Sequence, residues 1–203
     1  HSTSSSVNSF FHNSVYIGGV NSGVSNSSSF WRNSTTGNVQ VVNNLFHNYR
    51  SGTGSHYAIV NLTGTSWSTT ASNYNNLSTS NTSTLGMWPF WPLNSDKSFA
   101  AWKAISGGDM QSINTPVVFV NNENDLHLTY DNCDHVNRGI TSSITTDIDG
   151  EARNLTTPDI GADEFTLISC SGQPNAGVIS PASTQKCLGQ TYNMSVLGAS
   201  QAV

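Results

Sequence analysis

The first 95 positions of this chain contain no Asp or Glu, and Asp96 is the first acidic residue. Only 9% of the residues are charged, against roughly 25% in an average globular protein. The formal net charge is −5 and no cluster of Lys or Arg is present, which argues against nucleic-acid or anionic-membrane partners. No apolar run is long enough to cross a bilayer, so membrane insertion is not expected.

Cysteine is also scarce, with three residues in the chain: Cys133, Cys170 and Cys187. No Cys-x-x-Cys or Cys/His pair has the spacing of a zinc motif. Cys170 and Cys187 would close a short loop, and a disulfide fits a secreted chain rich in Ser, Thr and Asn. We therefore expect a Cys170–Cys187 disulfide and a free Cys133, although the residues alone allow three pairings.

Short apolar runs alternate with Gly, Ser and Asn along the chain. SVYIGGV (14–20), NVQVV (38–42) and HYAIVNL (56–62) are rich in β-branched residues and too short for helices. VNSFFHN (7–13) nearly recurs as VNNLFHN (42–48), 35 positions later, and a weaker copy places Asn-Asn-Leu at 75–77. Irregular repeats of this length predict a solenoid, and the β-branched runs make it an all-β solenoid.

Equivalent positions of such a solenoid stack on one another. Buried asparagines in one stack can pass hydrogen bonds along a ladder, and the repeat predicts this ladder for Asn8, Asn43 and Asn75. By the same alignment Phe11 stacks on Phe46, and His12 and His47 point outward.

Residues 85–113 break the repeat pattern. SDKSFAAWKAI (95–105) predicts a short helix that begins at Ser95, ends at Gly107 and inserts Trp102 against the strands. Just before it, the aromatic residues of LGMWPFWPLN could stack on sugars, with Trp88 and Trp91 as candidate glycan-binding residues. Their other role is burial in the core, which the neighbouring prolines favour.

A family resemblance rests on several of these segments in order. NSFFHNSVYI, VVNNLFHN, HYAIVN, FAAWKAISGGDMQSI, PVVFVNNENDLHL and TTDIDGEARNLTTPDIGADEF lie within residues 7–166. Together they resemble the C-terminal part of right-handed parallel β-helix domains of the choice-of-anchor type, found in secreted proteins of Bacteroidetes-type bacteria. DIDG-x-x-R followed by PDIGADEF is the most specific part.

The resemblance implies an organisation and a location. Residues 1–166 would be the last coils of the β-helix and its cap, 167–174 a linker, and 175–203 the start of an immunoglobulin-like β-sandwich. Such proteins leave a Gram-negative cell through the type IX secretion system, so the translocon and its shuttle proteins would be partners. The mature protein would be secreted or displayed on the cell surface.

The sequence DIDGEAR (147–153) suggests a calcium site, with Asp147 and Asp149 as candidate ligands. It lacks the remaining ligands of an EF-hand loop. The alternative is that these carboxylates accept turn hydrogen bonds while Arg153 pairs with an acid of the PDIGADE segment, and we favour this alternative. Calcium is thus the only cofactor that the sequence raises.

Three functions remain open. Carbohydrate-active β-helices need clustered carboxylates, and none precedes Asp96, so we predict a non-enzymatic, adhesin-like module that binds glycans or surfaces. A lyase or hydrolase whose active site lies mostly in missing N-terminal coils is the alternative. A passive structural stalk has nearly the same sequence signature.

Overall fold

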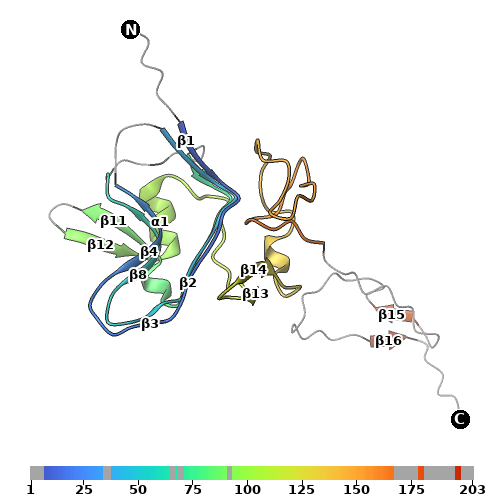
Figure 1. Ribbon diagram of the computed structural model, residues 1–203, viewed down its shortest axis with the longest axis horizontal. Helices are drawn as coiled ribbons and strands as arrows, with labels where there is room; N and C mark the ends of the chain where they lie inside the picture. The colour runs from blue at the N-terminus through green and yellow to red at the C-terminus, as the bar shows by residue number, and fades with distance from the viewer. Residues whose placement is uncertain are drawn as a thin grey trace, which may run out of the picture.

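The computed structural model describes residues 7–33, 38–64, 67, 71–90, 93–166, 178–180 and 195–197. The protein is built mostly of β-strands, arranged in parallel sheets, with few helices (Figure 1). The predicted all-β class is therefore confirmed. Among the described residues, no helix is both long and apolar enough to span a membrane.

Three parallel sheets are formed by strands from successive stretches of the chain. The first contains β1 (Val7–Phe11), β5 (Asn38–Val42) and β9 (Ser72–Asn73). The second contains β2 (Ser14–Ile17), β6 (Leu45–Asn48) and β10 (Asn76–Thr79). The third contains β4 (Ser27–Arg32), β8 (His56–Asn61) and β11 (Gly86–Phe90), and β12 (Leu93–Lys97) joins β11 antiparallel. A short parallel pair, β3 (Val20–Asn21) with β7 (Ser51–Gly52), lies between the second and third sheets along the chain.

The register between strands differs from the predicted alignment. Val7 pairs with Asn38 and Ser14 with Leu45, and equivalent residues in this part of the chain are 31 positions apart. The predicted offsets of 35 and 32 were therefore wrong. With the wrong offset each residue is matched to the wrong partner on the neighbouring strand, so the stacking inferred from the repeat does not hold. Phe46 stacks on Phe30 at 5.3 Å and not on Phe11.

The two histidines of the repeated triplet occupy different positions. His12 is buried at the bend between β1 and β2, with a left-handed φ of 53°. Its structural equivalents are Asn43 and Tyr74, with φ values of 59° and 55°. His47 is buried inside β6, where its ring stacks on Tyr16. Both histidines are buried, so the expectation that they face solvent was wrong, although His47 lies on the face of β6 opposite Phe46.

A ladder of asparagines exists, but with partly different members. Asn13 Nδ2 donates to Asn44 Oδ1 at 2.8 Å, and Asn44 Nδ2 donates to Asn75 Oδ1 at 3.1 Å. We call Asn13, Asn44 and Asn75 the asparagine row. Its amide oxygens also accept the backbone N–H of the preceding member, from Asn13 to Asn44 and from Asn44 to Asn75. The row thus provides hydrogen-bond acceptors for backbone N–H groups that lack a strand partner at the bends.

Two predicted ladder members lie outside this row. Asn8 is exposed in β1, opposite Val39, because the true register is 31 and not 35 residues. Asn43 is buried as predicted, but its amide bonds to His12 Nε2 and to the backbone of Ile140. Asn43 therefore ties the bend of the second stretch to the C-terminal half.

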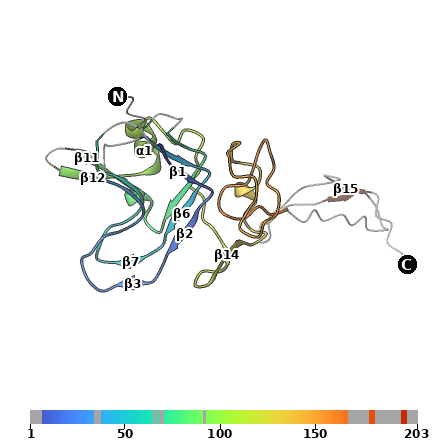
Figure 2. The same cartoon turned by 45° about the horizontal axis from the view of Figure 1, so that its top comes forward.

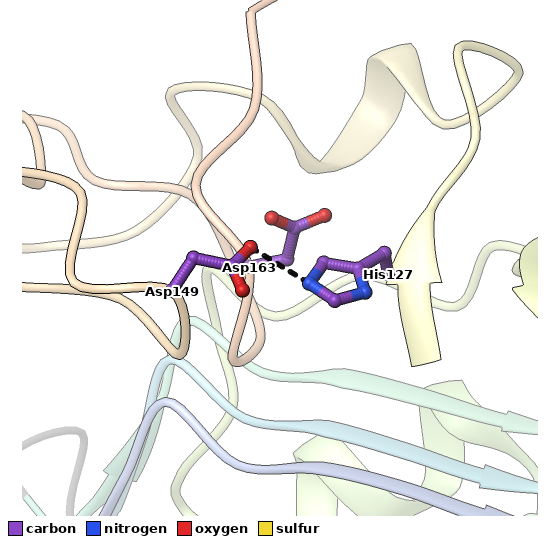
Figure 3. A group of neighbouring side chains, drawn as sticks. All are labelled: His127, Asp149 and Asp163. Atoms are coloured by element: carbon purple, nitrogen blue, oxygen red, sulfur yellow. Dashed lines mark hydrogen bonds and ion pairs between the residues drawn. The ribbon is translucent and has the colours of Figure 1, made fainter. Parts of the chain in front are cut away.

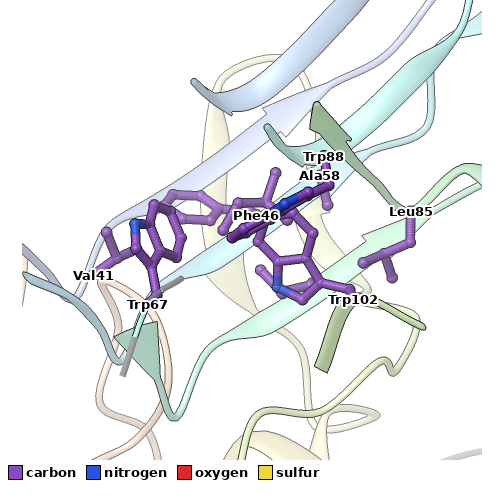
Figure 4. Close-up of a cluster of buried hydrophobic side chains, with 9 residues drawn as sticks. Val41, Phe46, Ala58, Trp67, Leu85, Trp88 and Trp102 are labelled. Atoms are coloured by element: carbon purple, nitrogen blue, oxygen red, sulfur yellow. The ribbon is translucent and has the colours of Figure 1, made fainter. Parts of the chain in front are cut away.

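The main hydrophobic core lies between the sheets and the helix α1 (Phe99–Ser106). Trp102 of α1 is buried and packs edge-on against Trp67 and Trp88 (Figure 4). The inserted Trp102 and the end of the helix at Gly107, in a left-handed conformation, are confirmed. The helix begins later than predicted, with Ser98 as its N-cap, because Ser95 belongs to β12 and pairs with Trp88.

The rest of the chain contains little regular structure. β13 (Phe119–Asn121) and β14 (Asp125–Leu128) form an antiparallel hairpin within the segment PVVFVNNENDLHL. Single 3-10 turns occur at η1 (Thr82–Thr84) and η2 (Cys133–His135), and β15 (Val178–Ser180) pairs antiparallel with β16 (Ser195–Leu197). Residues 129–166, yellow to orange in Figure 2, consist mainly of turns. Ile160 from this segment and Phe119 of the hairpin pack against Leu45 and Tyr16.

Candidate functional site

The DIDGEAR turn is organised by Asp147. Its Oδ1 accepts the backbone N–H of Asp149 at 3.0 Å and of Glu151 at 2.8 Å, and its Oδ2 accepts the N–H of Glu164 at 3.2 Å. Both oxygens are thus engaged in holding the turn, as the alternative reading of this motif predicts. The turn directs Asp149 away from Asp147 and toward the hairpin.

A histidine of the β13–β14 hairpin is hydrogen-bonded to Asp149. His127 lies on β14, and its Nε2 is 2.8 Å from Asp149 Oδ2. On the other side of the ring, Nδ1 is 2.5 Å from Oδ1 of Asp125, which also accepts the backbone N–H of His127. The Asp125 carboxylate therefore fixes the orientation of the ring, and Nε2 faces the DIDGEAR turn.

Asp163 completes a group of three side chains from separate parts of the chain (Figure 3). One ligand atom of His127, one of Asp149 and one of Asp163 all lie within 4.8 Å of one another. Asp163 is 7% exposed, and its Oδ2 accepts the backbone N–H of Leu128 at 2.9 Å. We call His127, Asp149 and Asp163 the His-Asp-Asp cluster.

The charges of the cluster shift the pKa values of its members. The pKa of His127 is raised to about 9, first because the ring bonds to Asp125 and then because it bonds to Asp149. The same bond to His127 lowers the pKa of Asp125. Burial raises the pKa of Asp163, and the nearby Asp147 and Asp149 add to this effect. The carboxylates around His127 therefore stabilise a positive charge on its ring.

The other acids of the PDIGADEF motif have structural roles. Arg153 is buried and pairs with Glu164 at 3.2 Å, as predicted, while it also donates to the carbonyl of Ala162. Asp159 accepts the N–H groups of Asn137 and Phe165, and burial raises its pKa to about 6. Arg153, Asp159 and Glu164 line a pocket, but their polar atoms bond to the protein's own backbone. In this motif, hydrogen bonds from backbone N–H groups to carboxylates hold consecutive turns together.

The predicted glycan-binding tryptophans are not supported as a site. Trp88 is 4% exposed and packs against Trp102, so it cannot stack on a sugar. Helix α1 covers the face of β11 to which Trp88 belongs, so the burial in the core that the sequence favoured is confirmed for Trp88 and its glycan-binding role is not. Trp91 lies outside the described residues.

The sulfur prediction also needs correction. Cys133, at the start of η2, is disulfide-bonded, whereas the spacing argument left it free. Cys170 and Cys187 both lie outside the described residues. Since the chain has three cysteines, a bond from Cys133 to either of them is incompatible with the predicted Cys170–Cys187 pair. Loop length alone does not reveal which cysteines meet in space.

Sequence reasoning named Asp149 as a candidate ligand but did not predict its arrangement with His127 and Asp163. His127 has no ligand spacing to another histidine, and Asp163 lies in the separate PDIGADEF motif. The alternation of DLHL is a signal for His127, because it places Asp125 and His127 on one face of a strand.

Comparisons with protein-family models, with curated proteins and with solved structures found no match. The resemblance to choice-of-anchor β-helix domains therefore remains a prediction.

Proposed function

We propose that the three parallel sheets are the faces of a right-handed parallel β-helix and that this domain acts outside the cell as a non-enzymatic binding module. A shared spacing of 31 residues supports the proposed architecture, because strands β1, β2 and β3 all pair with their equivalents at that offset. The asparagine row and the left-handed bends at His12, Asn43 and Tyr74 repeat with it.

One observation supports the non-enzymatic role above the others, and it concerns the carboxylates. The sequence up to Lys97 has a single acid, Asp96, which accepts a hydrogen bond from the Tyr57 hydroxyl. Asp109, Asp147, Asp159 and Glu164 accept hydrogen bonds from the protein's own groups, most of them backbone N–H or side-chain donors of neighbouring turns. A glycosidase or lyase needs carboxylates free to act on substrate.

Binding is the role that best suits the remaining surface. Polar side chains with few charges allow weak and repeated contacts with glycans, for which multivalency supplies avidity. We also propose that the type IX system exports the protein to the surface of a Gram-negative cell. This part of the proposal rests on the family resemblance of the sequence motifs described above.

The proposal is tested with the 203-residue chain and a panel of immobilised polysaccharides, with and without calcium. Retention and the release of reducing or unsaturated ends are measured in the same samples. We expect retention without product. Thermally unfolded protein serves as the control for non-specific adsorption.

Two outcomes would contradict the proposal. Product release that is lost in Asp149→Asn would indicate an enzyme that uses the exposed acid of the His-Asp-Asp cluster. Absence of retention on every polysaccharide would favour a passive stalk.

A further inference from the structure

The His-Asp-Asp cluster has features of a metal site that neither a calcium loop nor a simple ion pair would require. Its three members come from β14, from the turn at 147–150 and from the segment that follows Asp159. An imidazole nitrogen is a common ligand of zinc and other transition metals, whereas calcium takes oxygen ligands. The donor set of one nitrogen and two carboxylates therefore indicates the chemical class of the ion.

The spacing of the donors fits such an ion. Zinc binds nitrogen and oxygen at about 2.0–2.2 Å, so two of its ligand atoms lie about 3–4 Å apart. The donor atoms of His127, Asp149 and Asp163 lie within 4.8 Å of one another, with 2.8 Å between His127 and Asp149. If an ion replaced the proton between His127 and Asp149, the distance between Nε2 and Oδ2 would need to increase by only about 0.5 Å.

The largely buried carboxylate of Asp163 is a second feature that fits a cation. Asp163 is only 7% exposed, yet among the described residues a single donor, the N–H of Leu128, bonds to its carboxylate, at Oδ2. Its Oδ1 thus has no hydrogen-bond donor in the described part of the chain. This oxygen can therefore bind a cation, on a residue that is otherwise largely shielded from water.

The second carboxylate on the histidine has a recognisable function in metal sites. Ligating histidines commonly donate their other ring N–H to a carboxylate, which fixes the tautomer and the ring orientation. Asp125 Oδ1 holds Nδ1 of His127 in this way and leaves Nε2 facing Asp149 and Asp163. Asp147, which the sequence predicted as a ligand, supports the turn that carries Asp149.

We propose that His127, Asp149 and Asp163 bind a divalent transition metal of the zinc class, with Asp125 as the residue that orients the imidazole. The ion would join the β13–β14 hairpin to the DIDGEAR turn and to the PDIGADEF motif. With three protein ligands, its fourth position is open to water. This proposal does not depend on the extracellular binding role.

The test is calorimetric titration of the chelator-treated full chain with zinc chloride, together with the visible spectrum of the cobalt(II) form. We expect one equivalent of zinc to bind and cobalt to show the absorption of a low-coordinate site. Asp149→Asn and His127→Asn should weaken binding by far more than tenfold, and Asp125→Asn by about tenfold or more because it acts through the ring. Glu123→Gln, which removes an exposed acid from the turn of the same hairpin, is the matched control and should bind like the parent.

Circular dichroism establishes that each variant is folded. If Asp163→Asn fails to fold, Asp149→Asn decides the question, since the Asp149 side chain is 54% exposed. Zinc binding that is absent, or equal in Asp149→Asn and the parent, would overturn the proposal and leave protonated His127 as the cation of the cluster. Tight binding of calcium but not of zinc would overturn the assigned class of ion.

Discussion

The indole Nε1 of Trp102 donates a hydrogen bond of 2.8 Å to Oδ2 of Asp109, so helix α1 is bonded to the residue at which the asparagine row ends. Ser72 also donates to Oδ2, while Asn75 and Ser112 donate to Oδ1. Both oxygens of this buried carboxylate thus accept two hydrogen bonds. Asp109 joins the row to the aromatic core.

Asp109→Asn should therefore destabilise the protein although it barely changes the shape of the side chain. An amide presents an NH2 group to two of the four donors, and it lacks the charge that strengthens the other bonds. We expect a loss of roughly 2–5 kcal/mol in the free energy of unfolding. Because Asn tolerates the left-handed backbone found at Asp109 (φ 58°), backbone strain does not contribute. Urea denaturation measures the loss, and an unchanged midpoint would refute the role given to Asp109.

The asparagine row makes a second prediction. Asn44→Ala removes the acceptor for the backbone N–H of Asn13 and the donor to the carbonyls of Phe10 and Val42. The loss of these partly buried hydrogen bonds and of the fully buried Asn44 side chain should lower the free energy of unfolding by roughly 2–4 kcal/mol. Asn8→Ala is the control, since Asn8 is exposed, and its effect should stay within about 0.5 kcal/mol. Equal effects of the two substitutions in denaturant titrations would argue against the row.

A third prediction concerns pH. Burial is the main reason that the pKa of each of His12, His47 and His135 is lowered to about 4. In the unfolded chain these rings take up protons below pH of about 6.5, so stability is lost as the pH falls from about 6.5 toward 4. Asp159 acts in the opposite sense. Because its pKa is raised to about 6 in the folded state, its protonation stabilises the folded protein as the pH falls, but this single contribution opposes those of three histidines.

The net loss between pH 7 and pH 5 should be on the order of a few kcal/mol. His127, with its pKa raised to about 9, adds stability that is complete below pH of about 6.5 and is lost on the alkaline side. Chemical denaturation across this range measures the profile. His12→Asn, which copies the residue at the equivalent bend, Asn43, should flatten the acid limb; a limb of unchanged slope would exclude His12 as a contributor.

A fourth prediction compares two glycines with positive φ. A Cβ at Gly52 (φ +130°) would lie 2.0 Å from the carbonyl oxygen of Asn21, whereas a Cβ at Gly19 (φ +84°) meets nothing within 4 Å. Gly19→Ala should cost roughly 1–2 kcal/mol through its backbone alone. Gly52→Ala should cost clearly more, because β3 and β7 must separate. Thermal melts of the two variants make the comparison, and similar melting temperatures would show that the two stretches are not packed as closely as described.

The sequence was a reliable guide where local chemistry decides the structure. Short β-branched runs became parallel strands, and Gly107 ended the helix in the left-handed conformation that glycine favours. The pairing of Arg153 with Glu164 also followed from nearby charges within one motif.

The register could not be predicted from the repeated Phe-His-Asn triplet. In the first copy, His12 stands at a bend, and in the second, His47 stands inside a strand. The structural repeat is carried instead by residues of different types, such as His12, Asn43 and Tyr74, which share a backbone conformation and not a side chain. The His-Asp-Asp cluster was missed for a related reason, since its members are brought together only by the packing of the hairpin against the later turns.

The spacing between equivalent strands also determines where the chain can change in length. The offset is 31 residues along β1, β2 and β3 but 29 from β4 to β8, as the pair Ser27–His56 shows. Two residues are therefore lost at the corner that follows β3 and β7, and the offset is 31 again from β5 to β9, as the pair Val41–Ser72 shows. Natural insertions and deletions should accumulate at such corners, of which residues 22–26 and 53–55 are one pair, and an alignment of relatives that places gaps inside the paired strands would be out of register.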